Sequence, residues 1–154
     1  MRGASVAQGQ GGIHFSSGSF DLLGRMRDGT PVTDPLAGIA ALGTAEPGHP
    51  YAVIGAEACE RYARQVPRLL REAGIPVTGE CRQNHFRVTP MGKAVPTWLT
   101  IDGYLTAAEP GKLSFKTVCI VHVEGFLDFY PEFIAQEFRT YRVTCPLGTA
   151  NFPP

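Results

Sequence analysis

The chain has 154 residues, the usual size of one domain, and 44% of them are hydrophobic, which is enough to bury a single core. Its 14 basic and 14 acidic residues cancel, so there is no overall field to attract nucleic acid, and we expect no nucleic-acid partner. No apolar run approaches the roughly 18 residues that span a bilayer, so we expect a cytoplasmic chain without direct membrane insertion. The four cysteines form no Cys-x-x-Cys pair, which predicts reduced structural thiols and no metal site.

Glycine and proline punctuate the chain unevenly. They cluster in the first 50 residues and around residues 90–112, which predicts loops in both stretches. Asp34 and Pro35 are typical of an N-cap and a first helical residue, so we expect a short helix through about Leu42. The two prolines of segment 46–51 then argue against helix there.

The clearest element lies at Gly55–Ala73, where apolar residues recur every three or four positions. This period predicts one amphipathic helix that packs one stripe on a sheet. Pro67 in its interior is expected to kink it, and Gly74 is placed to end it in the left-handed conformation.

Strand character follows in three segments that together indicate a small, partly antiparallel sheet. They are Ile75–Glu80, Asn84–Thr89 and Trp98–Ile101.

The C-terminal part of the chain has a different pattern. Thr117–Val123 is a nearly continuous β-branched run, as in a strand buried on both faces. An amphipathic stretch from about Asp128 to Phe138 and a second strand at Tyr141–Cys145 complete a strand–helix–strand unit, the crossover that builds parallel sheets. The fold class is therefore mixed α/β, with a sheet of five or six strands and about three helices.

A search for a complete catalytic motif finds none, and the four histidines are isolated in sequence. We interpret His122, within an apolar strand, as a core histidine with satisfied hydrogen bonds. The Gly/Ser-rich segment 9–19 could bind an anion through backbone N–H groups and hydroxyls, although a surface loop is the commoner interpretation. Arg87 and Lys93 flank a turn and could pair with a phosphoryl group, although solvated surface charge is again commoner.

Several blocks, in order, resemble one bacterial family: the B subunit of anaerobic glycerol-3-phosphate dehydrogenase. The blocks are His14–Leu23, Asp28–Asp34, His49–Tyr51, Arg87–Gly92 with Thr97–Leu99, and Val121–Phe129. The resemblance implies a flavoprotein of the two-dinucleotide-binding-domain type, of which this chain is an internal section. The N-terminal glycine motif for the flavin pyrophosphate and a long C-terminal portion are the parts not matched.

The resemblance also implies an activity and partners. The family oxidises sn-glycerol 3-phosphate to dihydroxyacetone phosphate, and electrons pass through a flavin, FMN or FAD, towards the quinone pool of anaerobic respiration. A catalytic A subunit and an iron–sulfur membrane-anchor subunit are the implied partners, which would bring the chain to the inner face of the membrane. By carry-over, Ser16, Ser17, Gly18 and Ser19 would line the flavin. Arg87 or Lys93 would meet the substrate phosphate or a partner subunit, and no catalytic base is assigned.

We treat residues 1–154 as a single domain in three parts. Residues 1–33 are the Gly/Ser-rich loop region near the flavin, residues 34–112 hold helices and the small antiparallel sheet, and residues 113–147 form the strand–helix–strand unit. We expect the isolated chain to be inactive. Two alternatives stay open: a non-catalytic module that docks the companion subunit, and a stand-alone small α/β protein without enzymatic activity.

Overall fold

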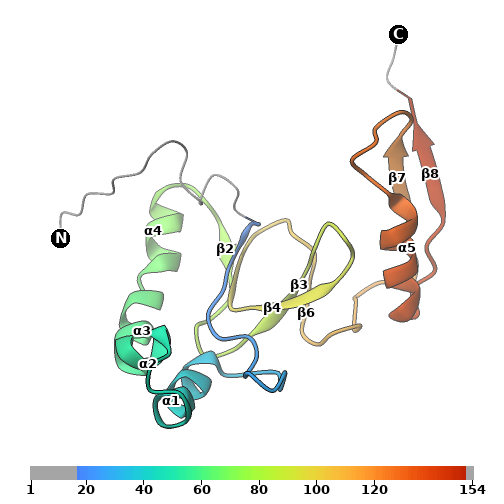
Figure 1. Cartoon of the computed structure of the whole chain (residues 1–154). Coiled ribbons are helices and arrows are strands. Elements are labelled where there is room, and N and C mark those ends of the chain that lie inside the picture. The colour runs from blue at the N-terminus through green and yellow to red at the C-terminus, as the bar shows by residue number, and fades with distance from the viewer. Residues whose placement is uncertain (1–16, 152–154) are drawn as a thin grey trace.

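The computed structural model describes residues 17–151, in which four helices follow the first strand, six short strands follow them, and one helix and one strand come last (Figure 1). The helices are α1 (Pro35–Ala45), α2 (Pro50–Ile54), α3 (Ala56–Ala63), α4 (Val66–Glu72) and α5 (Pro131–Thr140). The strands are β1 (Ser19–Phe20), β2 (Val77–Thr78), β3 (His85–Val88), β4 (Ala94–Thr97), β5 (Leu99–Ile101), β6 (Thr106–Ala107), β7 (Ile120–Val123) and β8 (Leu147–Ala150). The α/β class is confirmed. None of the described helices is long and apolar enough to cross a membrane.

The strands divide among three small sheets instead of the single sheet expected. The orders are β1-β5-β2, β4-β3-β6 and β7-β8. The first two sheets are antiparallel and the third is parallel. Figure 1 shows α1 to α4 beside the antiparallel sheets, with α5, β7 and β8 together at the other end of the molecule.

Helix α1 begins as the sequence predicts. The Asp34 carboxylate accepts hydrogen bonds from the Leu36 N–H at 2.9 Å and the Ala37 N–H at 3.1 Å, and Pro35 is the first helical residue. Leu36, Ile39 and Leu42 recur at three-residue spacing and are all buried in the core. The helix therefore packs one apolar stripe inward.

Helix α2 contradicts the expectation that segment 46–51 excludes helix. Pro50 occupies its first position, where the missing N–H has no intrahelical partner to lose. The His49 Nδ1 atom accepts a hydrogen bond from the Tyr51 N–H at 3.1 Å and caps the turn. Proline therefore starts a helix in a segment where we expected none.

The long helix predicted at Gly55–Ala73 is two helices, α3 and α4, and the prediction of one kinked helix is wrong. Pro67 is the second residue of α4, so it begins a new helix instead of bending an old one. The predicted end is confirmed, because Gly74 has φ +78°. The N–H of Gly74 donates to the Arg71 carbonyl at 3.0 Å, and the N–H of Ile75 donates to the Leu70 carbonyl at 2.9 Å.

Three strands lie around residues 90–112, and two of them, β4 and β6, were expected to be loop, whereas β5 matches the strand expected at Trp98–Ile101. β4 pairs with β3 and contains Pro96 opposite Phe86, while β6 pairs with the other side of β3. β4 is an edge strand of its sheet, which is where a residue without an N–H donor is tolerated. A high content of proline and glycine therefore led us to expect loop where β4 and β6 are found.

The C-terminal part of the described structure contains a strand, a helix and a strand in that order, but the strands differ from those expected. β7 and β8 pair in parallel, but β8 begins at Leu147 and not at Tyr141. β7 is not buried on both faces, because Val121 is 55% exposed. The Nδ1 atom of His122 is buried with no hydrogen-bond partner within residues 17–151, so the interpretation as a satisfied core histidine is also wrong.

Two apolar clusters form the core of the described structure. The larger one joins α1 and α3 to the first sheet through Leu23, Leu36, Ile39, Leu42, Cys59, Ala63, Val77, Cys81, Trp98 and Leu99. The smaller one lies between α5, β7 and the chain before β8 and contains Ile120, Ala135, Phe138, Val143 and Cys145. All four cysteines are unpaired, and only Cys119 is exposed.

Candidate functional site

The serine–glycine block enters the described structure at Ser17, so the expectation for Ser16 lies outside the described residues. Gly18 is buried and has φ +73°, a conformation that side chains rarely adopt. A Cβ atom at this position would overlap the ring of Tyr104. The backbone of the block thus packs directly on an aromatic ring, and glycine is required there.

Arg87 lies beside this block and not at the surface. Its side chain extends from β3 and the residue is only 6% exposed, and its Nε–H donates to the Ser19 Oγ atom at 3.0 Å. The Ser19 Oγ also lies 3.1 Å from the Ser17 Oγ and donates to Asp21 at 3.5 Å. The structure therefore brings Ser17, Ser19 and Arg87 together from segments 68 residues apart.

The start of β3 is held in place by a buried amide. Asn84 donates from its Nδ2 atom to the Leu23 carbonyl at 3.0 Å and to the Val32 carbonyl at 2.7 Å. Because buried amides are costly to leave unpaired, these bonds fix β3 against the N-terminal loop. Arg87, three residues on, is positioned by that attachment.

Lys93 is not part of this cluster. It is exposed, and it lies at the turn between β3 and β4, where the Thr89 N–H donates to its carbonyl at 2.8 Å and its own N–H donates to the Thr89 hydroxyl at 3.2 Å. The two cations that flank this turn in the sequence thus differ in burial and in surroundings.

Arg87 opens into a pocket of about 540 Å³, which we call the Arg87 pocket. Its lining residues are Ser17, Arg87, Val88, Thr89, Pro90, Tyr104, Leu105, Phe129, Ile134 and Phe138. Three of these come from α5 and the loop before it, so the pocket lies where the C-terminal unit meets β3. A cation and hydroxyls beside aromatic walls suit a ligand that has an anionic group and an apolar body.

A second pocket of about 530 Å³, which we call the His85 pocket, adjoins the first at Tyr104. Its lining residues are Thr78, His85, Thr100, Ile101, Asp102, Gly103, Tyr104, Thr106, Ala107 and Ala108. The His85 Nε2 atom lies 2.6 Å from the Thr100 Oγ1 atom, and Thr78 donates to Asp102 at 2.7 Å. Burial lowers the pKa of His85, which favours the neutral imidazole.

Sequence reasoning did not select His85. The signal that could have found it is its place two residues before Arg87 in a predicted strand, because alternate residues of a strand face the same side. That alternation links the histidine to the arginine through strand geometry alone.

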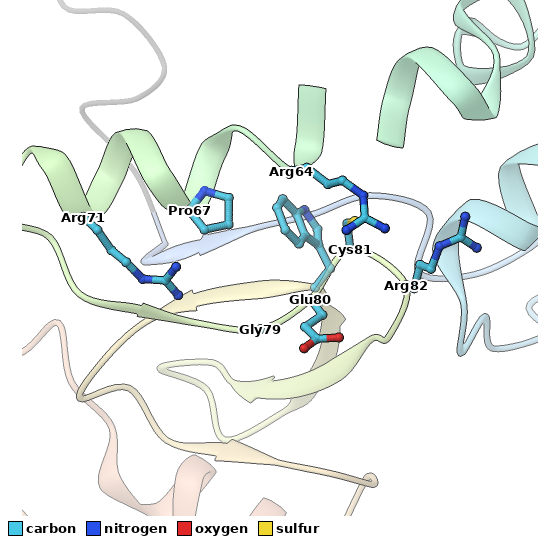
Figure 2. Close-up of a pocket in the computed structure, with 8 residues that line it drawn as sticks. Arg64, Pro67, Arg71, Gly79, Glu80, Cys81 and Arg82 are labelled. Carbon is cyan, nitrogen blue, oxygen red and sulfur yellow. The ribbon is translucent and has the colours of Figure 1, made fainter. Parts of the chain in front are cut away.

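A third pocket, drawn in Figure 2, collects three arginines but offers little free charge. Arg64 and Arg82 each pair with Glu60 at 2.6 Å, and Arg71 donates to the Val77 carbonyl at 3.0 Å. Burial raises the pKa of the Cys81 thiol between them, which disfavours the reactive thiolate. We interpret this pocket as structural.

The profile of the FAD binding domain family matches residues 3–145, so the chain belongs to that family. Among curated proteins, it is 38% identical over 151 residues to the B subunit of anaerobic glycerol-3-phosphate dehydrogenase from Yersinia pestis, covering 97% of this chain and 36% of that protein. The protein of the same name from Pectobacterium carotovorum is 41% identical over 153 residues, covering 99% and 36%. The chain thus spans about a third of the length of these relatives. No solved structure gives a significant match.

Membership of this family makes flavin the expected cofactor, and the described residues fit such a group. The bare backbone of Gly18 makes room for the Tyr104 ring, while Ser17 and Ser19 supply hydroxyls and Arg87 supplies a cation. These are the donors that phosphate and ring-carbonyl oxygens require, next to apolar walls that suit a planar ring.

Proposed function

We propose that this chain forms one wall of the flavin and substrate site of a quinone-linked oxidoreductase that converts sn-glycerol 3-phosphate to dihydroxyacetone phosphate. The chain alone is inactive in this proposal. The observation that carries it is the buried Arg87 side chain, which lines an apolar pocket and donates a hydrogen bond to Ser19. A cation in a site of low polarity attracts a phosphate more strongly than one in water, and Arg can do so with two parallel hydrogen bonds.

Each role rests on the family resemblance and, for residues within 17–151, also on the position of the residue. Ser16, Ser17, Gly18 and Ser19 border the flavin, and Arg87 binds the substrate phosphate. Lys93 is exposed outside the pocket, so we assign it to contact with a partner subunit. When bound, the flavin supplies the two-electron acceptor, and the protein orients the substrate and excludes water.

The proposed assembly contains a catalytic A subunit and an iron–sulfur membrane-anchor subunit. The relatives carry the name of one subunit of a dehydrogenase, which supports a multi-subunit assembly. In this arrangement the chain acts at the inner face of the membrane through its partners.

Calorimetric titration of the chain with sn-glycerol 3-phosphate, FMN and FAD tests the proposal, beside the full-length subunit. Arg87→Gln should weaken glycerol 3-phosphate binding at least about tenfold, because a charged hydrogen bond contributes about 1.5–3 kcal/mol. Ser17→Ala should weaken flavin binding by a smaller factor. Arg27→Gln is the matched control, because Arg27 is exposed and lines none of the pockets described above.

The proposal fails if Arg87→Gln and Arg27→Gln bind glycerol 3-phosphate equally well while both remain folded by circular dichroism. A loss caused by Lys93→Gln instead would move the phosphate to the turn. Arg87→Lys separates charge from geometry, because it keeps the cation but cannot reproduce the planar fork.

A second candidate function is docking of a companion subunit without catalysis. It is favoured by four large apolar side chains that are more than half exposed on the β7–α5 loop and the start of α5. They are Phe126, Leu127, Tyr130 and Phe133. Retention of the A subunit by Arg87→Gln but not by a Phe126→Ser/Leu127→Ser variant, with no ligand binding by the parent chain, would favour this function.

A further inference from the structure

Two side-chain contacts of the site, His85 with Thr100 and Arg87 with Ser19, lie next to each other because Ser19 and Thr100 are paired residues of neighbouring strands. His85 and Arg87 lie two residues apart on β3, and their side chains contact one pair of opposite residues in the adjoining sheet. Ser19 of β1 is the direct partner of Thr100 of β5. His85 contacts Thr100 at 2.6 Å and Arg87 contacts Ser19 at 3.0 Å, so the imidazole and guanidinium are anchored side by side.

The spacing along a strand sets the separation of the two groups. Two residues of strand advance about 7 Å, which therefore approximates the distance between the places where the two side chains leave β3. The phosphate and secondary hydroxyl of a three-carbon phosphate ester are separated by a few bonds and fit within that span. One small ligand can reach both groups.

Tyr104 connects the two pockets at the surface. It lines both the Arg87 pocket and the His85 pocket, and it is 48% exposed. Its ring rests on the buried backbone of Gly18, next to Ser17 and Ser19. A ligand held by Arg87 therefore needs to extend only past this ring to meet the histidine.

We propose that His85 accepts the hydroxyl proton when the secondary alcohol of a phosphate ester bound by Arg87 is oxidised. The inference rests on the proposed function and adds to it the base that the sequence could not assign. Nε2–H of His85 donates to Thr100 in this arrangement, which leaves the lone pair of Nδ1 to take the proton.

The step is balanced in atoms and electrons. The O–H bond breaks and its proton goes to Nδ1, while the C–H bond on the same carbon breaks and its hydrogen leaves with both electrons for the flavin. The electron pair of the O–H bond forms the C=O bond. The alcohol is oxidised by two electrons, the flavin is reduced by two, and the imidazolium releases its proton to solvent.

Burial favours the form of His85 that this role requires. Desolvation lowers its pKa, which favours the neutral imidazole, the form with a lone pair that can accept a proton. The charged and titratable groups around it are Asp102 and Tyr104 in its own pocket, Arg71 and Glu80 on its other side, and Arg87 on its own strand. A phosphate dianion brought in by Arg87 would stabilise the imidazolium and raise that pKa.

If the role of His85 is purely structural, its contact with Thr100 only holds two sheets together. Proton NMR of the chain distinguishes this role from that of a base. We expect the His85 ring signals to shift and its pKa to rise on addition of sn-glycerol 3-phosphate, with a smaller rise for inorganic phosphate. Arg87→Gln should abolish both effects. Unchanged His85 signals while Arg87-dependent binding persists would overturn the inference and leave the proposed function intact.

Kinetics of the full-length complex give the second readout. His85→Gln should lower kcat roughly 100-fold or more, which is the usual contribution of a general base, with little change in the KM for glycerol 3-phosphate. It should also remove the acidic limb of the pH profile. His49→Asn is the control, because it keeps a capping side chain and lies outside both pockets.

Circular dichroism of His85→Gln guards against a folding artefact, because its kinetics are compared only if the variant keeps the fold of the parent chain. If His85→Gln folds and keeps both kcat and the acidic limb, His85 is not the base. If glycerol 3-phosphate binds to neither the chain nor the complex in an Arg87-dependent way, the proposed function itself fails and takes this inference with it.

Discussion

The N-terminal body, residues 17–107, and the C-terminal unit, residues 113–150, each leave six large apolar side chains exposed, although the unit is less than half as long. The body encloses its larger cluster between helices and two antiparallel sheets. The unit has a two-stranded parallel sheet and one helix, and it leaves Leu127 77% exposed, with Phe126, Tyr130 and Phe133 also more than half exposed. Parallel sheets are normally covered on both faces, so the unit carries surface suited to further protein.

The two regions meet at the Arg87 pocket. β3 of the body supplies the arginine, and α5 with its preceding loop supplies Phe129, Ile134 and Phe138. Outside the pocket, the Ala94 N–H donates to the Tyr141 hydroxyl at 3.1 Å, and that hydroxyl donates to Glu137 at 3.1 Å. The proposed site therefore depends on a well-packed body and on a unit that has less packing of its own.

Substitution of a glycine with positive φ should destabilise the body far more than the C-terminal unit, and each region offers one such glycine for the test. Gly79 has φ +135°, and a Cβ there would collide with the Trp98 carbonyl, so Gly79→Ala should destabilise the body by about 4 kcal/mol from strain and overpacking together. Gly125 has φ +82° in open space, so Gly125→Ala should cost only about 1 kcal/mol. Urea unfolding measures the free energy of unfolding of both variants, and equal losses would show that the two glycines are not constrained differently.

The next largest effect isolates the C-terminal unit. Phe138 is buried and packs edge to face on Phe115 and Tyr141, so Phe138→Ala should remove about 3–5 kcal/mol of its packing. Hydrogen exchange should then lose protection in α5 and β7 while α1 and β5 keep theirs. Uniform loss in both regions would show that they unfold as one unit.

The sequence predicted those elements whose causes are local. The Asp34 cap and the Gly74 terminus are set by side chains and backbone within a few residues, and both are confirmed. β4 was missed because Pro96 is acceptable only on an edge strand, and edge position depends on which strand pairs with which. Pro50 and Pro67 were misinterpreted because a proline's effect depends on its place in the helix.

Only part of the candidate site could be predicted, because the contacts within it depend on strand pairing between distant segments. Ser17 and Ser19 were selected as members of one block and Arg87 was selected separately, but the contact between Ser19 and Arg87 depends on long-range pairing that no local pattern contains. His85 and Thr100 were missed because an isolated histidine gains meaning only from its partner on another sheet. The separation of Lys93 from Arg87 likewise follows from strand geometry, since one lies in β3 and the other at the turn that ends it.

The N-cap of α1 should contribute a smaller amount to the stability of the body. Asp34 caps α1, and Asp34→Ala should cost about 1 kcal/mol because two backbone N–H groups lose their acceptor. Asp34→Asn should restore most of this loss, since an asparagine side chain also accepts at an N-cap. Thermal unfolding measures the difference, and equal losses for both variants would mean that charge, not capping, is responsible.

The smallest change expected is in how folding stability decreases as the pH falls. Hydrogen bonds from Arg64 and then Arg82 lower the pKa of Glu60, so its contribution is present above the unfolded-state value and is lost as pH falls through the folded-state value. Glu60→Gln should therefore lower the unfolding midpoint slightly at neutral pH and match the parent chain in acid, because the surface pair is screened by solvent. Glu124→Gln, an exposed carboxylate of the C-terminal unit, is the control and should leave the midpoint unchanged at both pH values. A Glu60→Gln chain that is destabilised equally at every pH would show that side-chain packing, and not the carboxylate charge, joins α3 to the loop that carries Arg82.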